Sequence, residues 1–293
     1  MSDKTAVGFI GLGDIGRHMA AHLVRDTLAP RVFDLVPEAV AALVEAGATA
    51  AASVGELAAA CDYIAICVRD DAQVDAVLHG EDGVLANARP GALILVHSTV
   101  TQANLLRWAE EAQATGLRLI DAPMTGGAAR AEAGTLCYMV GGTAQELAEV
   151  SPILETSAEK IVHAGPLGAG IALKLCNNYI QYTEFVALAE AARLADACGL
   201  SLDVIREVGL SNGVVNPQMH QFVSGRNGLA PACSDAQMQE IFGGHGTLAR
   251  KDLDCVLATA QQQGVVMPTA EFIRDRIENV FLARDESRPP ANQ

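Results

Sequence analysis

The stretch VGFIGLGDIGR, residues 7–17, decides the fold of this chain, together with an aspartate at position 34. Glycines stand at positions 11, 13 and 16, after an apolar run and before residues with helical periodicity. Gly11 suits a tight turn after a strand, Gly13 lets a bound group approach the backbone, and Gly16 lets the next helix pack close to the sheet. We therefore expect a strand, a glycine-rich turn and a helix in this order.

This arrangement is typical of a site for the pyrophosphate of a dinucleotide, because amides and the helix dipole at a helix start favour negative charge. Asp34 follows a second short strand pattern, Arg31–Phe33. Its carboxylate can accept hydrogen bonds from ribose hydroxyls and would repel a 2′-phosphate, which favours NAD as the cofactor. The alternative is a structural glycine turn in another fold. The turn residues expected to contact the cofactor are Gly11, Leu12, Gly13, Asp14, Ile15 and Gly16.

Composition excludes several classes of protein. The 293 residues suffice for two domains, and a net charge of -15 argues against nucleic acid or an anionic membrane surface as a partner. Seven cysteines show no CxxC pair and no zinc spacing, so we expect reduced thiols and no metal site. We expect no signal peptide, because MSDKT leads directly into the first strand pattern, and no membrane span, because no apolar run is long enough for one. These features predict a cytoplasmic protein.

Short apolar runs alternate with helix-period segments through the first half of the chain, which predicts a mainly parallel sheet of the Rossmann type, covered by helices. Ligands of such sheets bind beyond the carboxyl ends of the strands. The expected strands are 7–10, 31–33, 63–68, 93–96, 117–120, 136–140 and 160–162, and the expected helices are 15–25, 37–46, 54–60, 72–78, 101–115 and 144–157.

After His163 the pattern becomes helical, beginning with one long helix from Gly170 to about Cys198. We expect an α/β chain with an NAD-binding Rossmann domain, residues 1–165, and an all-helical domain for substrate binding and dimerisation, residues 166–293, joined by this helix. The helix is apolar over much of its surface, so we also expect a partner subunit, in a homodimer or homotetramer. Further helices are expected at 202–208, 248–263 and 269–284.

Lys174 and Asn178 lie four residues apart in the long helix and therefore share one face. A lysine amine facing a nicotinamide can give a proton to a carbonyl oxygen that receives hydride, or take one from an alcohol. The ordinary lysine pKa of about 10.4 is high for this role, so burial or nearby cations should lower it. The alternative is a surface lysine next to a structural asparagine.

The segment from Asp121 to Leu136, DAPMTGGAARAEAGTL, follows a predicted strand. Thr125, Gly126 and Gly127 can form a small nest that binds a substrate carboxylate through a hydroxyl and successive amides. Arg130 can add a bidentate contact. The alternative is a plain turn with Thr125 as a helix cap.

A third segment, Val96–Val100, ends a strand at the ligand side of the sheet. Thr99 can contact the cofactor or the substrate there, and a helix cap is the alternative. His97 is a candidate general base, although a single histidine at a strand end is more often structural. Lys251 and Asp252, by themselves, fit an exposed ion-pair face of a helix.

In this order and spacing, GFIGLGDIG, the DAPxTGG segment, GxGxxxKLxxN and the Lys-Asp-Leu triplet make the chain resemble the β-hydroxyacid dehydrogenase family over residues 5 to 285. The resemblance implies a Rossmann domain joined by a long helix to a helical domain. It implies that Lys174 is the catalytic lysine, with Asn178 in support, and that a small anionic hydroxy acid is the substrate. Thr125, Gly126 and Gly127 match the loop that binds the substrate carboxylate. The cofactor-lining positions are Val68, Arg69, Thr99 and Lys251, and Asp252 lies beside them.

Some residues depart from the family pattern. Thr125 stands where serine is more frequent, and Arg130 where glycine is usual, so Arg130 either selects a second acidic group or points to solvent. Val96 stands where an aspartate is often found, which leaves the local hydrogen bonding open. Members that prefer NADP tend to have asparagine and arginine where this chain has Asp34 and Leu35, so NAD remains the expected cofactor. The alternatives are a non-catalytic regulatory protein and a reductase of another carbonyl or imine.

Overall fold

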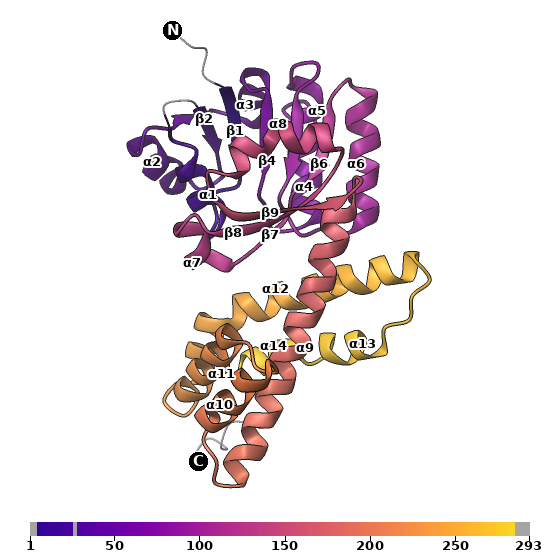
Figure 1. Ribbon diagram of the computed structural model, residues 1–293. Helices are drawn as coiled ribbons and strands as arrows, with labels where there is room; N and C mark the ends of the chain where they lie inside the picture. The colour runs from indigo at the N-terminus through magenta and orange to yellow at the C-terminus, as the bar shows by residue number, and fades with distance from the viewer. Residues whose placement is uncertain (1–4, 26–27, 285–293) are drawn as a thin grey trace. The chain divides into compact units, whose positions relative to one another are not determined.

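The computed structural model describes residues 5–25 and 28–284. The chain divides into two compact units, Met1–Lys174 and Leu175–Gln293. The division falls inside one long helix, α9 (Ala169–Ala197), so this helix begins in the first unit and ends in the second (Figure 1). The predicted domain boundary after residue 165 stays a prediction.

Among the described residues, nine strands of the first unit form one sheet in the order β3-β2-β1-β4-β5-β6-β8-β7, with β9 paired to β8. Strands β1 to β6 are parallel to one another. The order β3-β2-β1-β4-β5-β6 is that of a Rossmann fold, and the direction of winding reverses between β1 and β4, where such sheets bind their ligands. The strands are β1 (Thr5–Ile10), β2 (Leu28–Phe33), β3 (Thr49–Ala50), β4 (Tyr63–Ile66), β5 (Leu93–Val96), β6 (Arg118–Asp121), β7 (Met124–Thr125), β8 (Leu136–Gly141) and β9 (Ala158–Gly165).

Helices cover the sheet of the first unit (Figure 1). Met19 and Val150, which come from two of these helices, share a buried cluster with Val7 and Leu95 of the sheet. Leu57 lies against Gly8 of β1, where a β-carbon would come within 2.2 Å of its side chain. Parallel strands need cover on both faces, which explains their nearly continuous apolar sequence. The helices are α1 (Gly16–His22), α2 (Pro37–Glu45), α3 (Val54–Ala60), α4 (Asp71–Leu78), α5 (Val84–Asn87), α6 (Gln102–Ala114), α7 (Gly127–Glu132) and α8 (Ala144–Leu154).

The second unit is helical throughout its described part. Its core forms where Phe185 and Ala189 of α9 pack with Phe242, Leu253 and Phe281 from later helices. Aromatic rings meet edge to face in this core, such as those of Phe185 and Phe222 at 4.9 Å between centroids. The helices after α9 are α10 (Leu202–Asn212), α11 (Pro217–Leu229), α12 (Asp235–Gln262), α13 (Pro268–Arg274) and α14 (Ile277–Phe281).

The predicted fold class is confirmed, and the differences concern short or glycine-containing elements. The sequence contains no clear signal for β3 and β7, which have two residues each, or for the short helices α5 and α7. Helix α11 was also missed, although its start is signalled by Asn216 as N-cap and Pro217 in the first turn. Helix α12 begins at Asp235, before the predicted residue 248. The glycines at 243, 244 and 246 are unfavourable in helices, so the sequence pattern did not indicate its first half. The predicted helix 269–284 is two helices, α13 and α14.

No helix in the described part of the chain combines the length and the apolar character that a bilayer span requires.

Candidate active site

The carboxyl ends of five parallel strands lie level with one another in the first unit. Ile10 pairs with Phe33 on one side and with Ile66 on the other, and Val96 pairs with both Ile66 and Asp121. Every one of these residues is the last of its strand. The segments that follow the strands, which contain most of the predicted cofactor and substrate residues, therefore leave the sheet along one edge. This edge includes the reversal point between β1 and β4.

The glycine turn after β1 has the shape that a dinucleotide pyrophosphate needs. Gly11 has φ +96°, and a β-carbon there would lie 2.3 Å from the carbonyl oxygen of Cys67. At Gly16 a β-carbon would lie 2.1 Å from the carbonyl oxygen of Gly11, whereas at Gly13 it would meet nothing within 4 Å. The turn therefore packs tightly against the protein at Gly11 and Gly16 and has free space at Gly13, so the residues present fit a dinucleotide.

Asp34 lies at the end of β2 and is half-buried. Its Oδ2 accepts a hydrogen bond from the amide of Leu12 at 2.6 Å, and its Oδ1 accepts one from the amide of Val36 at 2.8 Å. The carboxylate is thus fixed beside the glycine turn, and each oxygen keeps a lone pair that can accept a hydrogen bond from a ribose hydroxyl. The next side chain, Leu35, is 87 % exposed and does not contribute to the core.

Ser98 joins the segments after β4 and β5. Its hydroxyl donates to the carbonyl of Val68 at 2.7 Å and accepts from the amide of Val68 at 2.9 Å. The amide of Arg69 donates to the side-chain oxygen of Gln73 at 2.9 Å. Val68 and Thr99, two of the predicted cofactor residues, are therefore held on adjacent segments by the buried serine between them.

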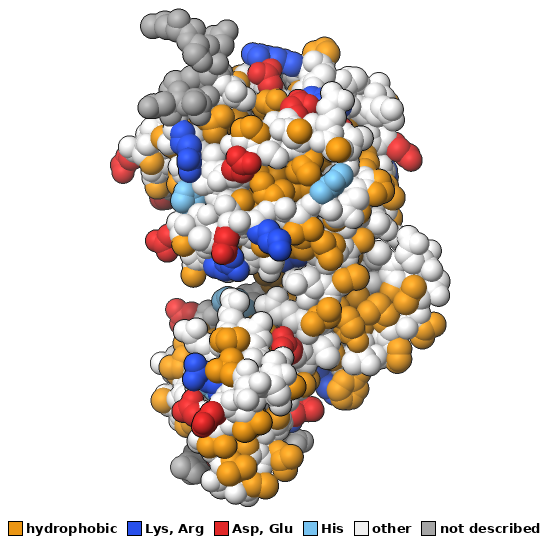
Figure 2. Space-filling model, in the orientation of Figure 1, with side chains coloured by type: hydrophobic (Ala, Val, Ile, Leu, Met, Phe, Trp, Pro, Cys, Tyr) orange, Lys and Arg blue, Asp and Glu red, His pale blue; other side chains and the backbone are white. Residues whose placement is uncertain are grey.

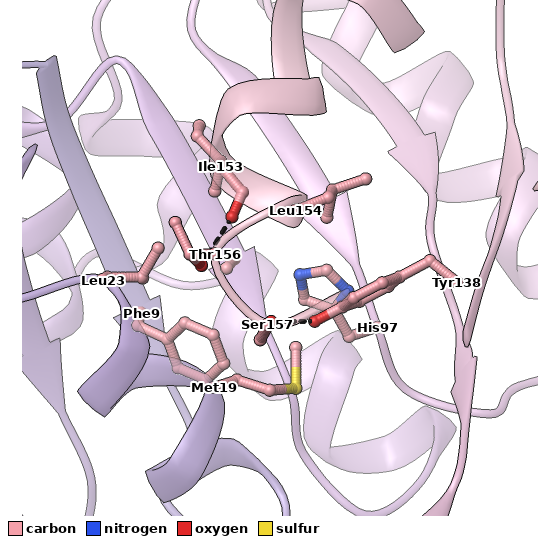
Figure 3. A pocket seen from close by; sticks show the side chains of 10 residues that line it. Phe9, Met19, Leu23, His97, Tyr138, Ile153, Leu154, Thr156 and Ser157 are labelled. Atoms are coloured by element: carbon pink, nitrogen blue, oxygen red, sulfur yellow. Dashed lines mark hydrogen bonds between the residues drawn. The ribbon is translucent and has the colours of Figure 1, made fainter. Parts of the chain in front are cut away.

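His97 lies in the core of the first unit. Its Nδ1 is 2.7 Å from the carbonyl oxygen of Ala122, and its ring stands 5.8 Å from that of Tyr138. Figure 3 shows His97 and Tyr138 lining a small cavity, where the Tyr138 hydroxyl meets that of Ser157. The cavity has a volume of about 10 Å³ and holds at most one water molecule. Burial lowers the pKa of His97 to about 4, so the imidazole is neutral at pH 7. This environment favours the structural interpretation of His97 over that of a general base.

His97 makes the stability of the first unit depend on pH. Its pKa falls from 6.5 to about 4 on folding, so the unfolded chain binds a proton that the folded chain excludes between these values. The stabilising contribution is complete above pH 6.5 and is lost as the pH falls toward 4, by about 3 kcal/mol in all. We expect the difference in the free energy of unfolding between the wild type and His97→Gln, measured from urea unfolding curves, to become smaller as the pH falls over this range. A constant difference would contradict the burial of a neutral imidazole.

The predicted carboxylate loop runs from Thr125, the last residue of β7, through Gly126 to Gly127, the first residue of α7. Gly126 has φ +138° and Gly127 has φ +69°, conformations that side chains rarely adopt. A β-carbon at Gly126 would also come within 2.9 Å of the β-carbon of Arg130. The guanidinium of Arg130 donates to the carbonyl of Thr135 at 2.8 Å and pairs with Glu159. The loop thus presents backbone amides at the start of α7, while the charge of Arg130 is balanced by a protein carboxylate.

Lys174 lies on α9, where it is half-buried, and it is the last residue of the first unit. The start of α9 is held by Asp121, whose carboxylate accepts hydrogen bonds from the amides of Gly168 at 2.8 Å and Ile171 at 2.7 Å. Burial raises the pKa of Asp121, and the amides of Gly168 and Ile171 oppose this effect because they stabilise the charged form. The helix that contains the predicted catalytic lysine is therefore joined directly to the end of β6.

Asp252 is the centre of a polar cluster in the second unit and is 3 % exposed. Its Oδ2 accepts hydrogen bonds from the amide nitrogen of Asn178 and the hydroxyl of Tyr182, both at 2.8 Å. Its Oδ1 is 2.8 Å from the Nζ of Lys251. Burial and the charge of Asp252 raise the pKa of Tyr182, so the phenol keeps its proton and remains a donor. The cluster fixes the amide of Asn178 with its nitrogen toward Asp252. Its oxygen accepts from the side-chain nitrogen of Asn177 at 3.5 Å and keeps a lone pair for a further donor.

Some predicted residues are connected through side chains for which the sequence alone indicates no role. Asn178 and Lys251 both contact Asp252. The predicted ion pair between Lys251 and Asp252 is present, but the expectation of an exposed face is wrong for Asp252, which is buried. Tyr182 was missed, although its spacing of four residues after Asn178 places both on one helix face. Ser98 and Asp121 were also missed, because their partners, Val68 and the start of α9, are distant in sequence.

Within the described part of the chain, no group of three or more histidine, cysteine, aspartate or glutamate side chains is placed to hold a metal ion. Burial raises the pKa of Cys61 to about 11 and that of Cys67 to about 12, so both thiols are protonated near pH 7.

Comparisons with known proteins agree with this geometry. Residues 6–165 match the model of the NAD-binding domain of 6-phosphogluconate dehydrogenase. Residues 168–287 match the model described as the NAD-binding domain of NADP-dependent 3-hydroxyisobutyrate dehydrogenase. The first unit is therefore of an NAD(P)-binding type.

Individual relatives extend over most of the chain. The 3-hydroxyisobutyrate dehydrogenase of Pseudomonas aeruginosa is 34 % identical, with 92 % of this chain and 90 % of the relative covered. An NAD-dependent L-serine dehydrogenase of the same organism is 39 % identical over 69 % of this chain and 68 % of its own length. The solved structure of Mycobacterium tuberculosis 3-hydroxyisobutyrate dehydrogenase with L-serine has a TM-score of 0.81 at 29 % identity and covers 97 % of this chain and 95 % of its own. The chain therefore belongs to the β-hydroxyacid dehydrogenase family of NAD(P)-dependent oxidoreductases.

Proposed function

We propose that this protein transfers a hydride reversibly between NAD and a short β-hydroxy acid, which becomes the corresponding semialdehyde or keto acid. The observation that supports this most strongly is the polar set on α9: Lys174 supplies an amine, and Asn178, four residues later, has its amide fixed by Asp252. A non-catalytic protein that merely retained the fold would have no need to fix this amide with a buried carboxylate.

In the proposed reaction, Lys174 is the general acid and base. It accepts the hydroxyl proton as the alcohol is oxidised and returns it in the reverse direction. Asn178 orients the substrate oxygen, with its own orientation set by Asp252 and Tyr182. A bound nicotinamide supplies the hydride acceptor or donor.

We infer that NAD is preferred over NADP. The carboxylate of Asp34 is held beside the glycine turn, where it can accept hydrogen bonds from both ribose hydroxyls and would repel a 2′-phosphate. Gly11 to Gly16 would hold the pyrophosphate, and Val68, Arg69, Thr99 and Lys251 are proposed to line the rest of the cofactor.

The proposed substrate has one carboxylate, which Thr125 and the amides around Gly126 and Gly127 would bind. 3-Hydroxyisobutyrate and L-serine, the compounds in the names of two relatives, both place a hydroxyl on the carbon next to the one that bears the carboxylate. The function is tested by following absorbance at the nicotinamide band with a panel of hydroxy acids and NAD. Turnover of at least one short β-hydroxy acid is expected, whereas inactivity across the panel would favour a non-catalytic protein.

Arg130 is not expected to select a second acidic group, because Glu159 already balances its charge. We expect Arg130→Ala to leave the ratio of kcat/KM for a monocarboxylic hydroxy acid to that for a dicarboxylic one unchanged. The measurement compares 3-hydroxyisobutyrate with 2-(hydroxymethyl)glutarate in the wild type and the variant. A selective loss of activity toward the dicarboxylate would assign Arg130 to substrate binding instead.

We also infer that the protein is a homo-oligomer, joined through the second unit. An apolar groove of about 450 Å³ is lined by residues of α9, α10 and α11 and of the segment between α10 and α11, including Ile180, Ile205 and Val214. Apolar side chains also protrude from the same unit, such as Leu194 at 68 % and Val208 at 60 % exposure, and Figure 2 shows apolar side chains over its visible face. Because groove and protruding side chains occur on one unit, two copies related by a two-fold axis can cover each other.

Light scattering during size-exclusion chromatography tests this assembly. Ile180→Glu with Val214→Glu is expected to produce smaller particles, because a charge would be buried in each groove. Val44→Glu, at an exposed apolar position of α2, is the matched control and should keep the native mass. A monomeric wild type, or a double variant of unchanged mass, would contradict this interface.

A further inference from the structure

We propose that Asp121 is a positioning residue for Lys174: its carboxylate caps the start of α9 and thereby fixes the helix that contains the lysine. This inference rests on the proposed function, because it concerns how the proposed general acid and base is held. Asp121 is the last residue of β6 and is fully buried. Neither the cofactor turn nor the carboxylate loop uses its side chain.

Each of the two carboxylate oxygens of Asp121 caps a different backbone amide at the start of α9. Oδ1 accepts from the amide of Gly168 at 2.8 Å, and Oδ2 accepts from the amide of Ile171 at 2.7 Å. The first amides of any helix lack partners within the helix. The local sequence cannot supply them, because residues 165–170, GPLGAG, contain no polar side chain. The cap of α9 therefore comes from a strand 47 residues earlier in the chain.

The carboxylate of Asp121 is packed closely against two glycines, Gly141 and Gly170. A β-carbon at Gly141 would lie 2.3 Å from Oδ1, and one at Gly170 would lie 2.8 Å from Oδ2 and 2.3 Å from the carbonyl oxygen of Met139. The same start of α9 is also held by Gln102, whose side-chain nitrogen donates to the carbonyl of Gly168 at 3.1 Å. The start of the helix cannot shift or rotate without loss of these contacts.

Lys174 follows Ile171 by three residues, which is less than one helical turn and about 4.5 Å along the axis. A helix is stiff over this length, so the position of its first turn sets the position of the lysine. Asp121 also precedes Thr125 by four residues, in the segment that forms the proposed carboxylate loop. One short segment thus positions both the amine and the loop for the substrate carboxylate. Proton transfer is sensitive to such placement, because misplacement by about 1 Å can lower a rate about 100-fold.

The test is Asp121→Asn, which keeps the size of the side chain but replaces one acceptor oxygen with an amide NH2 group, a donor that faces a backbone N–H. We expect kcat for the hydroxy acid to fall about 10- to 100-fold, measured well below the unfolding temperature. The dissociation constant of NAD should be unchanged, because Asp34 and the glycine turn are untouched. Hydrogen exchange of the amides from Gly168 to Lys174 should become faster.

The matched control is Ser53→Ala, which removes the side-chain cap of α3 in the same unit. It should lower the unfolding temperature but leave kcat unchanged. If Asp121→Asn behaves in the same way, with lower stability and normal kcat, Asp121 is only a structural cap and the proposal is wrong. If Asp121→Asn does not fold, Gln102→Ala decides: lower kcat with an unchanged unfolding temperature and NAD affinity supports the proposal, and unchanged kcat overturns it.

The failure of this inference differs from a failure of the proposed function. An inactive wild type would refute the function and with it any role of Asp121 in turnover. An active wild type with an equally active Asp121→Asn would refute the role of Asp121 alone.

Discussion

Lys174→Ala is expected to lower kcat for the hydroxy acid by about 1000-fold, because positioned acid and base groups contribute about 10²- to 10⁴-fold. The alanine variant retains the glycine turn and Asp34, so NADH, which carries the same ribose and pyrophosphate as NAD, should bind with wild-type affinity. Stopped-flow or steady-state absorbance at the nicotinamide band measures the first quantity, and fluorescence titration with NADH measures the second. A loss of kcat with intact cofactor binding would place the lysine in the chemical step.

Two further variants separate proton transfer from charge. Lys174→Arg keeps a positive charge, but a guanidinium with a pKa above about 12 does not release its proton, so this variant should be nearly as inactive as alanine. Lys160→Ala removes an exposed lysine of β9 and should behave as wild type. Near-normal turnover by Lys174→Ala would refute the assignment, and recovery of activity in Lys174→Arg would mean that charge alone matters.

The double variant Asp34→Asn/Leu35→Arg is expected to shift cofactor preference toward NADP. Asparagine keeps one oxygen that can accept from the amide of Leu12, and the side chain at position 35 is exposed, so the arginine fits without repacking. Loss of the repelling carboxylate and gain of a guanidinium for the 2′-phosphate should change the ratio of kcat/KM for NAD and NADP about 100-fold, or about 3 kcal/mol.

The control for this experiment places the arginine one residue later. Asp34→Asn/Val36→Arg has the same charge, and Val36 is also exposed, but the segment directs this side chain differently. It should show a smaller shift than the Leu35→Arg variant. An unchanged NAD to NADP ratio in both double variants would remove Asp34 from the ribose site.

The glycine turn and the alternation of strands and helices were sufficient to predict the Rossmann sheet. This was possible because both signals are local: glycine is needed where φ is positive or the backbone is crowded, and the burial of a parallel strand is visible as an apolar run. Elements without such a signal were missed, such as the two-residue β3 and β7 and the polar helix α11. The start of α12 was missed for the opposite reason, because its glycines indicate a turn although packing keeps them helical.

For the candidate site too, local spacing predicted some features and could not predict others. Motif spacing predicted Lys174 and Asn178 on one helix face and Thr125 to Gly127 in a loop after a strand. It could not predict that Glu159 pairs with Arg130, or that Asp252 is buried and binds Asn178. Those pairings join residues that are about 30 and about 70 positions apart, and no periodicity in the sequence records them.

By itself, the sequence determined the fold class and the dinucleotide turn, because each depends on neighbours within a few positions. The residues proposed for chemistry came from the order of four motifs along the chain, which resembles that of a known family. Only the tertiary structure decided which side chains hold them in place: Asp121 at the start of α9, Ser98 beside Val68, and Asp252 beside Asn178. The physical reason is that a buried polar group must find its hydrogen-bond partner wherever the fold brings one close, at any distance along the chain.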